Sequence, residues 1–255
     1  MGASWDPAQY NAFAAEREQP FWDLAGLIEP VESPALADLG CGDGRLTAAL
    51  HRRLQARATV GVDSSQEMLA EAAAHAGEGI EFVAGDIAHW AASEQDVVFA
   101  NAALQWVGDH PAVLERWRNA LGANGQLAVQ VPANADHASH RVARELADEW
   151  LGETSPADPV ANNVLPPEVY ARLLAELGFE HQHVRLQVYT HTLASSSDVV
   201  EWVKGTSLTR FKAVLEADDY ERFVEEYRVR LVAELGDYAP YLYTFKRILM
   251  WGRLG

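Results

Sequence analysis

The 255-residue sequence is poor in cysteine and in basic residues. Its single cysteine, Cys41, excludes a disulfide within the chain and a zinc site built on cysteine pairs, and on this ground we expect a cytoplasmic protein. Lysine and arginine together number 20 against 37 aspartates and glutamates, which gives a formal net charge of −17. A surface this acidic repels phosphate groups, so we expect neither nucleic acid nor an anionic membrane as a partner.

Long hydrophobic runs are also missing. The longest mostly apolar stretch covers residues 97–107 and falls well short of the ~20 residues that a membrane-spanning helix needs. The stretch MGASWDPAQYNAF lacks a basic region followed by an apolar core, so we expect no secretory signal there. With 49% hydrophobic and 22% charged residues, the composition is typical of a folded domain. We expect a monomer or a weak homodimer that acts on a small molecule.

Apolar runs alternate with helical patterns along the first half of the sequence. Strands that alternate with helices form a mostly parallel sheet covered on both faces, so we predict an α/β, doubly wound fold. A helix is expected over residues 45–54, and another opens at Pro111. The expected strands are residues 35–39, 58–63, 80–86, 96–102 and 126–132.

The second half of the sequence departs from this alternation. We expect strands over 183–191 and 241–254, and residues 5–28 read as helical with a break at Pro20. Further helices are expected over 137–151, over 168–177 and in two later stretches. We predict a single domain over residues 1–255, with a core of about 31–133, 166–193 and 239–255 and cap segments of about 1–30, 134–165 and 194–238.

Three glycines at alternating positions follow the first predicted strand, in ALADLGCGDGRL (residues 35–46). Gly40, Gly42 and Gly44 permit tight turns and let a ligand touch the main chain, and the helix that opens next favours negative charge at its N-terminus. The dinucleotide fingerprint is G-x-G-x-x-G, but this loop lacks the third glycine. It also places the Asp43 carboxylate where a pyrophosphate would sit, which disfavours NAD and suits a ligand with a cationic end.

Acidic residues end the next two predicted strands. Asp63 ends the second strand, and its carboxylate offers two oxygens to the two hydroxyls of a ribose. Asp86 ends the third strand. Each acid alone could simply cap a helix, but the pair behind a glycine loop indicates a nucleoside-binding site.

The segment DLGCGDGR resembles the first motif of the class I S-adenosylmethionine-dependent methyltransferases, D/E-x-G-x-G-x-G. The resemblance implies a seven-stranded, Rossmann-like methyltransferase fold with helical cap insertions. It also implies S-adenosylmethionine as the cofactor, released as S-adenosylhomocysteine. By this resemblance, Asp86 is expected to accept the adenine amino group and Ile87 to donate its N–H to the ring. Asn101 holds the methionine end, and Asp38 faces the ammonium group.

The residues expected at the cofactor are Trp5, Tyr10, Asp38, Gly40, Cys41, Gly42, Gly44, Asp63, Ser64, Met68, Asp86, Ile87 and Asn101. Trp5 and Tyr10 could close over the cofactor as an aromatic lid, or could staple the first helix. Ser64 or Ser65 can cap the helix that carries Met68.

Longer segments resemble one family among these enzymes, the trans-aconitate 2-methyltransferases, which methylate a carboxylate of a small tricarboxylic acid. They include WDPAQYNAFAAER, FANAALQWVGDH, LAVQVPANADHASH and FKRIL. A carboxylate is already ionised at pH 7, so its methylation needs no strong general base. The other carboxylates of such an acceptor need cationic partners, and the planar fork of arginine suits them.

Candidates for the acceptor site follow from this resemblance. Gln105 and Trp106 should lie beside the methyl group in transfer, with His140 as a third catalytic candidate. The substrate-binding candidates are Arg17, Arg210, Arg247 and Tyr241. Four of these residues could instead be structural: Trp106 in packing, His140 as a surface or capping residue, and Arg17 and Arg247 in surface or ion-pair roles.

Two other functions stay open. Tyr238, Tyr241, Tyr243 and Phe245 could line an apolar pocket, which would indicate a tailoring methyltransferase that acts on O, N or C of a larger metabolite. The cofactor site alone would also suit a non-catalytic binding module. We expect no metal, because no carboxylate or cysteine completes a ligand set with His181, His183 and His191.

Overall fold

The computed structural model describes the backbone of residues 14–255 and the side chains from residue 18 onward. The chain forms two compact units. We name them the sheet unit (residues 20–132, 163–187 and 247–255) and the helical unit (described residues 14–19, 133–162 and 188–246). Trp5, Tyr10 and the side chain of Arg17 lie outside the described residues.

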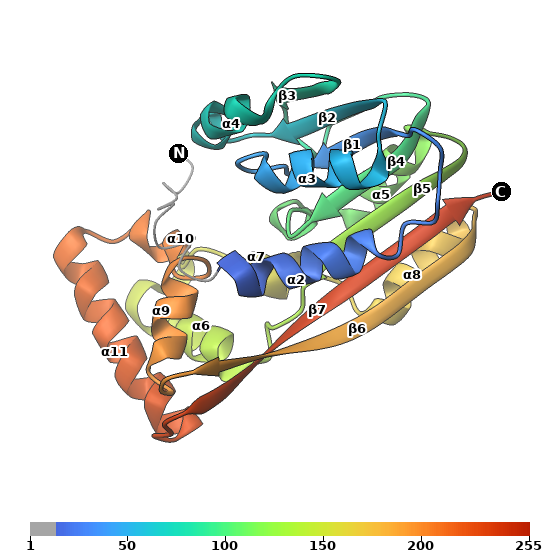
Figure 1. Ribbon diagram of the computed structural model, residues 1–255. Coiled ribbons are helices and arrows are strands. Elements are labelled where there is room, and N and C mark those ends of the chain that lie inside the picture. The colour runs from blue at the N-terminus through green and yellow to red at the C-terminus, as the bar shows by residue number, and fades with distance from the viewer. Residues whose placement is uncertain (1–13) are drawn as a thin grey trace. The chain divides into compact units, whose positions relative to one another are not determined.

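A seven-stranded sheet with the order β3-β2-β1-β4-β5-β7-β6 forms the centre of the sheet unit (Figure 1). Its strands are β1 (Ala35–Leu39), β2 (Ala58–Asp63), β3 (Ile80–Ala84), β4 (Gln95–Asn101), β5 (Leu121–Pro132), β6 (Phe179–Leu193) and β7 (Tyr241–Leu254). β1 pairs in parallel with β2 and β4, whereas β7 runs antiparallel to β5. The predicted doubly wound, mostly parallel sheet is therefore confirmed. The strand order reverses at β1, and sheets of this kind bind ligands at the carboxyl ends of the strands beside such a point.

The central strands form because their sequences are apolar on both faces. Leu36, Ala37 and Leu39 in β1 are at most 1% exposed, and Val97 to Ala100 in β4 are fully buried. A parallel strand covered by helices on both sides requires such a continuous apolar run. The helices that cover this sheet are α2 (Ala14–Ala25), α3 (Arg45–Leu54), α4 (Gln66–Ala72), α5 (His110–Asn119) and α8 (Pro167–Glu176).

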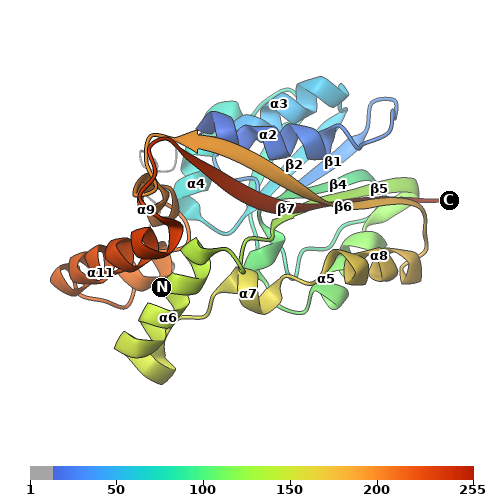
Figure 2. The ribbon, with the colours of Figure 1, turned by 90° about the horizontal axis from the view of Figure 1, so that it is seen from below.

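The two faces of the sheet are covered by different helices (Figure 2). Phe21 and Leu24 of α2 and Leu50 of α3 pack into one core with side chains of β1, β4, β5 and β7. α5 and α8 lie on the opposite face. The carboxyl ends of β1, β2 and β4 are thus left to the loops that carry the candidate site residues.

The helical unit is built around a separate hydrophobic core. Its helices are α6 (Ala138–Leu151), α7 (Pro159–Asn163), α9 (Asp198–Lys204), α10 (Thr209–Lys212) and α11 (Ala217–Leu235). Tyr243 and Phe245 of β7 belong to this core together with Trp202, Phe211 and Phe223. Their burial explains the aromatic C-terminal segment, so Tyr243 and Phe245 do not line the apolar pocket that the tailoring alternative requires.

Several element bounds differ from the sequence-based expectations. The prediction of a break at Pro20 is wrong, because α2 continues through this residue. Burial of Phe21, Leu24 and Ala25 on one side of the helix holds it together. The two helical stretches expected after residue 193 are three helices, α9 to α11. None of the described helices is long and apolar enough to cross a membrane.

Candidate active site

The glycine loop after β1 is held by backbone hydrogen bonds to the end of β2. The N–H groups of Gly40 and Cys41 both donate to the carbonyl of Val62, at 2.7 and 3.1 Å. Gly42 has a φ of 57°, and a Cβ added to it would meet nothing within 4 Å. A backbone position that favours glycine therefore faces open space, as close approach of a ligand to the main chain requires.

Asp63, the last residue of β2, links this loop to the next helix. Its Oδ2 accepts the N–H of Gly42 at 2.9 Å, and its Oδ1 accepts the N–H of Ser65 at 2.9 Å. A carboxylate has about four acceptor sites, so each oxygen can accept one further hydrogen bond. Ser65, and not Ser64, caps α4 by accepting from the N–H of Met68. Ser64 is exposed and Met68 half-buried.

Asp38 lies beneath the loop and is buried. The hydroxyl of Thr47 donates to its Oδ2 at 2.5 Å. Burial raises the pKa of the Asp38 carboxyl to about 7, the bond from Thr47 opposes this rise, and the charge of Asp63 adds to it. A cationic group bound nearby would stabilise the ionised form.

Asp86 lies two residues beyond the end of β3, which stops at Ala84 and not at residue 86 as expected. Its carboxylate accepts the N–H of Ala88 at 2.9 Å and contacts Nδ1 of His89 at 2.7 Å. The hydrogen bond from the Ala88 N–H makes the largest contribution to lowering the pKa of Asp86, followed by the hydrogen bond with His89. The carbonyl of the buried Ile87 accepts the indole N–H of Trp117 at 2.9 Å, so this turn has a fixed backbone.

Two buried amide oxygens at the carboxyl end of β4 have no hydrogen-bond partner in the described part of the chain. They are Oδ1 of Asn101, the last residue of β4, and Oε1 of Gln105. Unpaired buried acceptors are rare and costly, and in native proteins they indicate a missing donor. S-adenosylmethionine carries an ammonium group with three donors and a cationic sulfur. These oxygens, the open loop and the neighbouring acids fit such a cofactor, whereas the negative charge of a pyrophosphate would be repelled by the acids.

Gln105 and Trp106 lie on a single 3₁₀ turn, η2 (Leu104–Trp106), directly after β4. The Nε2 of Gln105 donates to the carbonyl of Ala102 at 2.7 Å, which fixes the amide. Trp106 is 50% exposed, so it does not have the buried packing role that was its structural alternative. Both side chains project from η2.

A buried network holds η2 against α8. The Nε2 of His110 lies 2.9 Å from the carbonyl of Leu104 and 3.1 Å from that of Val107. These carbonyls only accept, so Nε2 carries the proton and Nδ1 accepts from the hydroxyl of Tyr170 at 2.7 Å. That hydroxyl also accepts the N–H of Leu165 at 3.1 Å. Burial lowers the pKa of His110, which favours this neutral form.

Replacing Tyr170 with phenylalanine is expected to lower the free energy of unfolding by about 1–3 kcal/mol, because Nδ1 of His110 and the N–H of Leu165 both lose their buried partner. Urea unfolding monitored by circular dichroism measures the change. Tyr238→Phe is the matched control, since Tyr238 is 59% exposed and water can bind its hydroxyl. Equal losses in the two variants would contradict the network.

The other predicted residues of the sheet unit have mixed surroundings. The side chain of Cys41, a residue of the glycine loop, is buried. Burial together with the charge of Asp38 raises the pKa of its thiol. Gly44 has a φ of 72°, and a Cβ there would lie 2.6 Å from the ring of Phe82. These two residues shape the loop through packing. Arg247 in β7 places Nη1 3.4 Å from Oε1 of Gln130.

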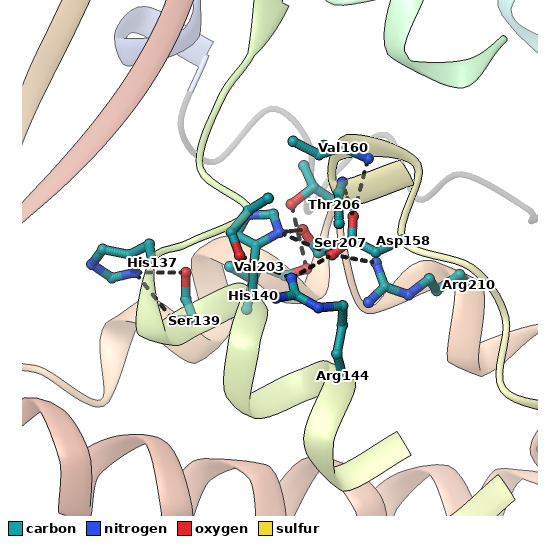
Figure 3. A network of polar contacts seen from close by, with 12 residues as sticks. His137, Ser139, His140, Arg144, Asp158, Val160, Val203, Thr206, Ser207 and Arg210 are labelled. Atoms are coloured by element: carbon teal, nitrogen blue, oxygen red, sulfur yellow. Dashed lines mark hydrogen bonds and ion pairs between the residues drawn. The ribbon is translucent and has the colours of Figure 1, made fainter. Parts of the chain in front are cut away.

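In the helical unit, His140 and Arg210 both face Asp158, a residue that sequence reasoning missed (Figure 3). Oδ2 of Asp158 lies 3.6 Å from Nδ1 of His140 and 3.5 Å from Nη1 of Arg210. Nη1 of Arg144, a further missed residue, lies 3.4 Å from the same oxygen. His140 has neither of its structural alternatives, because it is buried and the residue that caps α6 is His137.

Asp158 itself lies directly before α7, and its Oδ1 accepts the N–H groups of Val160 and Ala161 at 3.1 and 3.4 Å. Burial alone would raise its pKa, but the hydrogen bond from His140 and the charge of Arg210 outweigh it and hold the pKa of Asp158 well below its usual value. Two sequence signals could have found this cluster. His140 and Arg144 share one face of α6 at a spacing of four, and an aspartate before a proline is typical of a helix start.

Tyr241 and the histidines of β6 have other surroundings. Tyr241 is half-buried and its ring centroid is 6.5 Å from that of Tyr238. His191 stacks on Trp202 at 4.6 Å, while His181 and His183 are exposed. Among the side chains of residues 18–255, no group of three or more histidines, cysteines, aspartates or glutamates could hold a metal ion.

Comparisons with known proteins find methyltransferases similar to this chain. The family described as a methyltransferase domain matches residues 36–125, from β1 into β5. A trans-aconitate 2-methyltransferase of Deinococcus radiodurans is 39% identical, over 96% of this chain and 96% of its own length. The trans-aconitate 2-methyltransferase of Streptomyces avermitilis is 40% identical, over 89% of this chain and 88% of its own.

Solved structures share the fold at low sequence identity. The YcgJ protein of Bacillus subtilis has a TM-score of 0.62 at 14% identity, over 93% of this chain and 98% of its own. A phosphoethanolamine N-methyltransferase of Haemonchus contortus, solved with S-adenosylhomocysteine, has a TM-score of 0.58 at 15% identity, over 93% of this chain and 52% of its own. At such identities the likeness concerns the fold alone.

Proposed function

The chain belongs to the trans-aconitate 2-methyltransferase family of S-adenosylmethionine-dependent methyltransferases, and we propose that it methylates a carboxylate of trans-aconitate or a similar small organic acid. The observation that carries this proposal is the pair of unpaired buried oxygens of Asn101 and Gln105 beside the open glycine loop. They provide acceptors for a cationic donor at the carboxyl end of β4.

In this proposal, different residues of the sheet unit bind different parts of the cofactor. The open main chain at Gly42 receives the ligand, and the remaining acceptor sites of Asp63 take the ribose hydroxyls. Asp86 and the backbone of Ile87 bind the adenine. Asp38 and Asn101 take the ammonium group. When bound, S-adenosylmethionine supplies a methyl group attached to a positively charged sulfur.

The task of the protein is then to orient an acceptor that is already ionised. The reference pKa of a carboxyl group is about 4, so no side chain has to remove a proton. Holding the attacking oxygen in line with the methyl group lowers the barrier, and excluding water favours a step in which opposite charges disappear. We assign Gln105 and Trp106 to this positioning, because η2 presents both next to Asn101.

The working context follows from the same features. We propose that the protein acts in the cytoplasm, as a monomer or weak homodimer, without a nucleic-acid or membrane partner. The net charge of −17 supports this proposal, since it opposes binding to phosphate-rich surfaces.

Purified protein mixed with S-adenosylmethionine and trans-aconitate is expected to release S-adenosylhomocysteine and to form a product one methyl group heavier. Mass spectrometry of the acceptor and chromatography of the cofactor measure the two products. A reaction without trans-aconitate is the control for slow cofactor hydrolysis. Tight cofactor binding without turnover of trans-aconitate would contradict the acceptor, and a larger metabolite would then have to be sought.

A further inference from the structure

The Asp158 cluster of the helical unit has more donors than its one carboxylate can satisfy. One oxygen of Asp158 is occupied by two backbone N–H groups of α7. The other faces His140, Arg144 and Arg210 at 3.6, 3.4 and 3.5 Å. Hydrogen bonds between charged nitrogen and oxygen are ordinarily about 2.7–2.9 Å, so all three contacts are long. A single oxygen is shared among three donors, and Nη1 of Arg144 has a shorter contact, 2.9 Å, with the carbonyl of Ala135.

The donors that lack an acceptor are clearest on Arg210. Its side chain is only 11% exposed, yet Nε and Nη2 are buried without a hydrogen-bond partner in the described residues. These two nitrogens form one edge of the guanidinium plane, the fork that binds both oxygens of a carboxylate. Its other faces are occupied, with Nη1 directed at Asp158 and the cation 4.5 Å from the centre of the Phe211 ring.

Charge leads to the same conclusion as hydrogen bonding. Two arginines and one aspartate leave a net charge of +1 when His140 is neutral, inside a chain whose total is −17. One further carboxylate would bring the cluster to neutrality. Arg144 is 32% exposed, so the cluster is reached from solvent on its side, while the shielded fork of Arg210 strengthens any ion pair formed there.

We propose that this cluster is a carboxylate subsite of the helical unit, in which Arg210 and Arg144 bind one carboxylate of a small organic acid such as trans-aconitate. Asp158 is the positioning residue that holds the cations in place, and His140 supplies a third donor. The identity of the ligand rests on the proposed function, whereas the anion site itself does not.

Equilibrium binding tests the subsite separately from turnover. Calorimetric titration of trans-aconitate into protein saturated with S-adenosylhomocysteine is expected to show about 10- to 100-fold weaker binding for Arg210→Gln, since a hydrogen-bonded charge pair is lost. Affinity for S-adenosylhomocysteine should stay unchanged. Arg141→Gln is the matched control, because Arg141 lies on α6 as Arg144 does and pairs with Glu145 at 3.0 Å. Equal affinity in wild type and Arg210→Gln would overturn the subsite.

Truncated ligands show whether the loss concerns one carboxylate. Itaconate, mesaconate and glutaconate each resemble trans-aconitate without one of its three carboxylates. One of the three is expected to bind wild type and Arg210→Gln equally, because it lacks the group that Arg210 holds. Similar losses for all three would contradict a specific contact and indicate general damage to the protein.

Asp158→Asn gives an opposite signature. Without the counter-charge, Arg144 and Arg210 repel each other, so the melting temperature in buffer should fall and its rise on adding trans-aconitate should exceed that of wild type. An equal rise would count against the subsite. Binding of trans-aconitate by wild type without methyl transfer would refute the proposed function and leave the subsite standing. Methyl transfer to trans-aconitate together with equal affinity for it in wild type and Arg210→Gln would do the reverse.

Discussion

Replacing Asp63 with alanine is expected to weaken S-adenosylmethionine binding by about 100-fold or more. In the proposed site, Asp63 accepts two hydrogen bonds from ribose hydroxyls, each worth about 1.5–3 kcal/mol, and the variant loses both. The N–H groups of Gly42 and Ser65 also lose their acceptor, so the loop is no longer held in its binding conformation. Isothermal titration with S-adenosylmethionine measures the change directly.

The matched control for this variant is Asp96→Ala. Asp96 lies near the start of β4, accepts the N–H of Ala35 at 2.8 Å and pairs with Arg57 at 2.7 Å. It has the same side chain in the same sheet, but at the amino ends of the strands. We expect some loss of stability and unchanged cofactor affinity. Ordinary affinity in Asp63→Ala would refute the assignment of this residue to the ribose.

Asp38→Asn is expected to stabilise the cofactor-free protein at alkaline pH while it weakens cofactor binding. The pKa of Asp38 is raised from 3.8 to about 7 in the folded state, so the folded protein binds more protons than the unfolded chain between these values. Stability therefore falls as the pH rises through this window. A shift of about 3 units corresponds to about 4 kcal/mol at pH 8. Asparagine stays neutral and still accepts the bond from Thr47.

Urea unfolding at pH 5 and pH 8 measures this effect. The advantage of Asp38→Asn over wild type should grow by roughly 2–3 kcal/mol between the two values, since part of the penalty is already present at pH 5. Asp96→Asn is the control for a less buried carboxylate. Parallel pH dependence in wild type and Asp38→Asn would show that Asp38 ionises normally. With cofactor present, the order should reverse, because the ammonium group needs the ionised acid.

Several strands could be predicted because burial on both faces is visible in a sequence. β1, β2 and β7 have the expected bounds, and each is mostly apolar. β5 instead begins at Leu121, five residues early, with Gly122, Asn124 and Gly125 inside it. The pairing of β4 with β5 shifts register there, and Asn124 has a φ of 58°. A bulge thus accommodates residues that locally favour a turn, and only the pairing of strands reveals it.

The two halves of the candidate site differ in the same way. Asp63 and Asn101 were predictable because a polar side chain and a strand end coincide at one sequence position. Asp158 lies in a loop rich in proline, and its partners come from α6 and α10. Sequence reasoning could name Arg210 as a cation for an acceptor. The shared oxygen and the unpaired fork depend on side chains that only the tertiary fold brings together.

Because Cys41 is buried within the glycine loop, the reactivity of its thiol reports when the loop opens. Thiolates and not thiols react with alkylating reagents, and this sulfhydryl is both enclosed and hard to ionise. Iodoacetamide can label the chain only in the moments when the loop opens, and no second cysteine competes for the reagent. The labelling rate therefore measures how often the loop opens locally. Any ligand that binds to the loop should lower this rate.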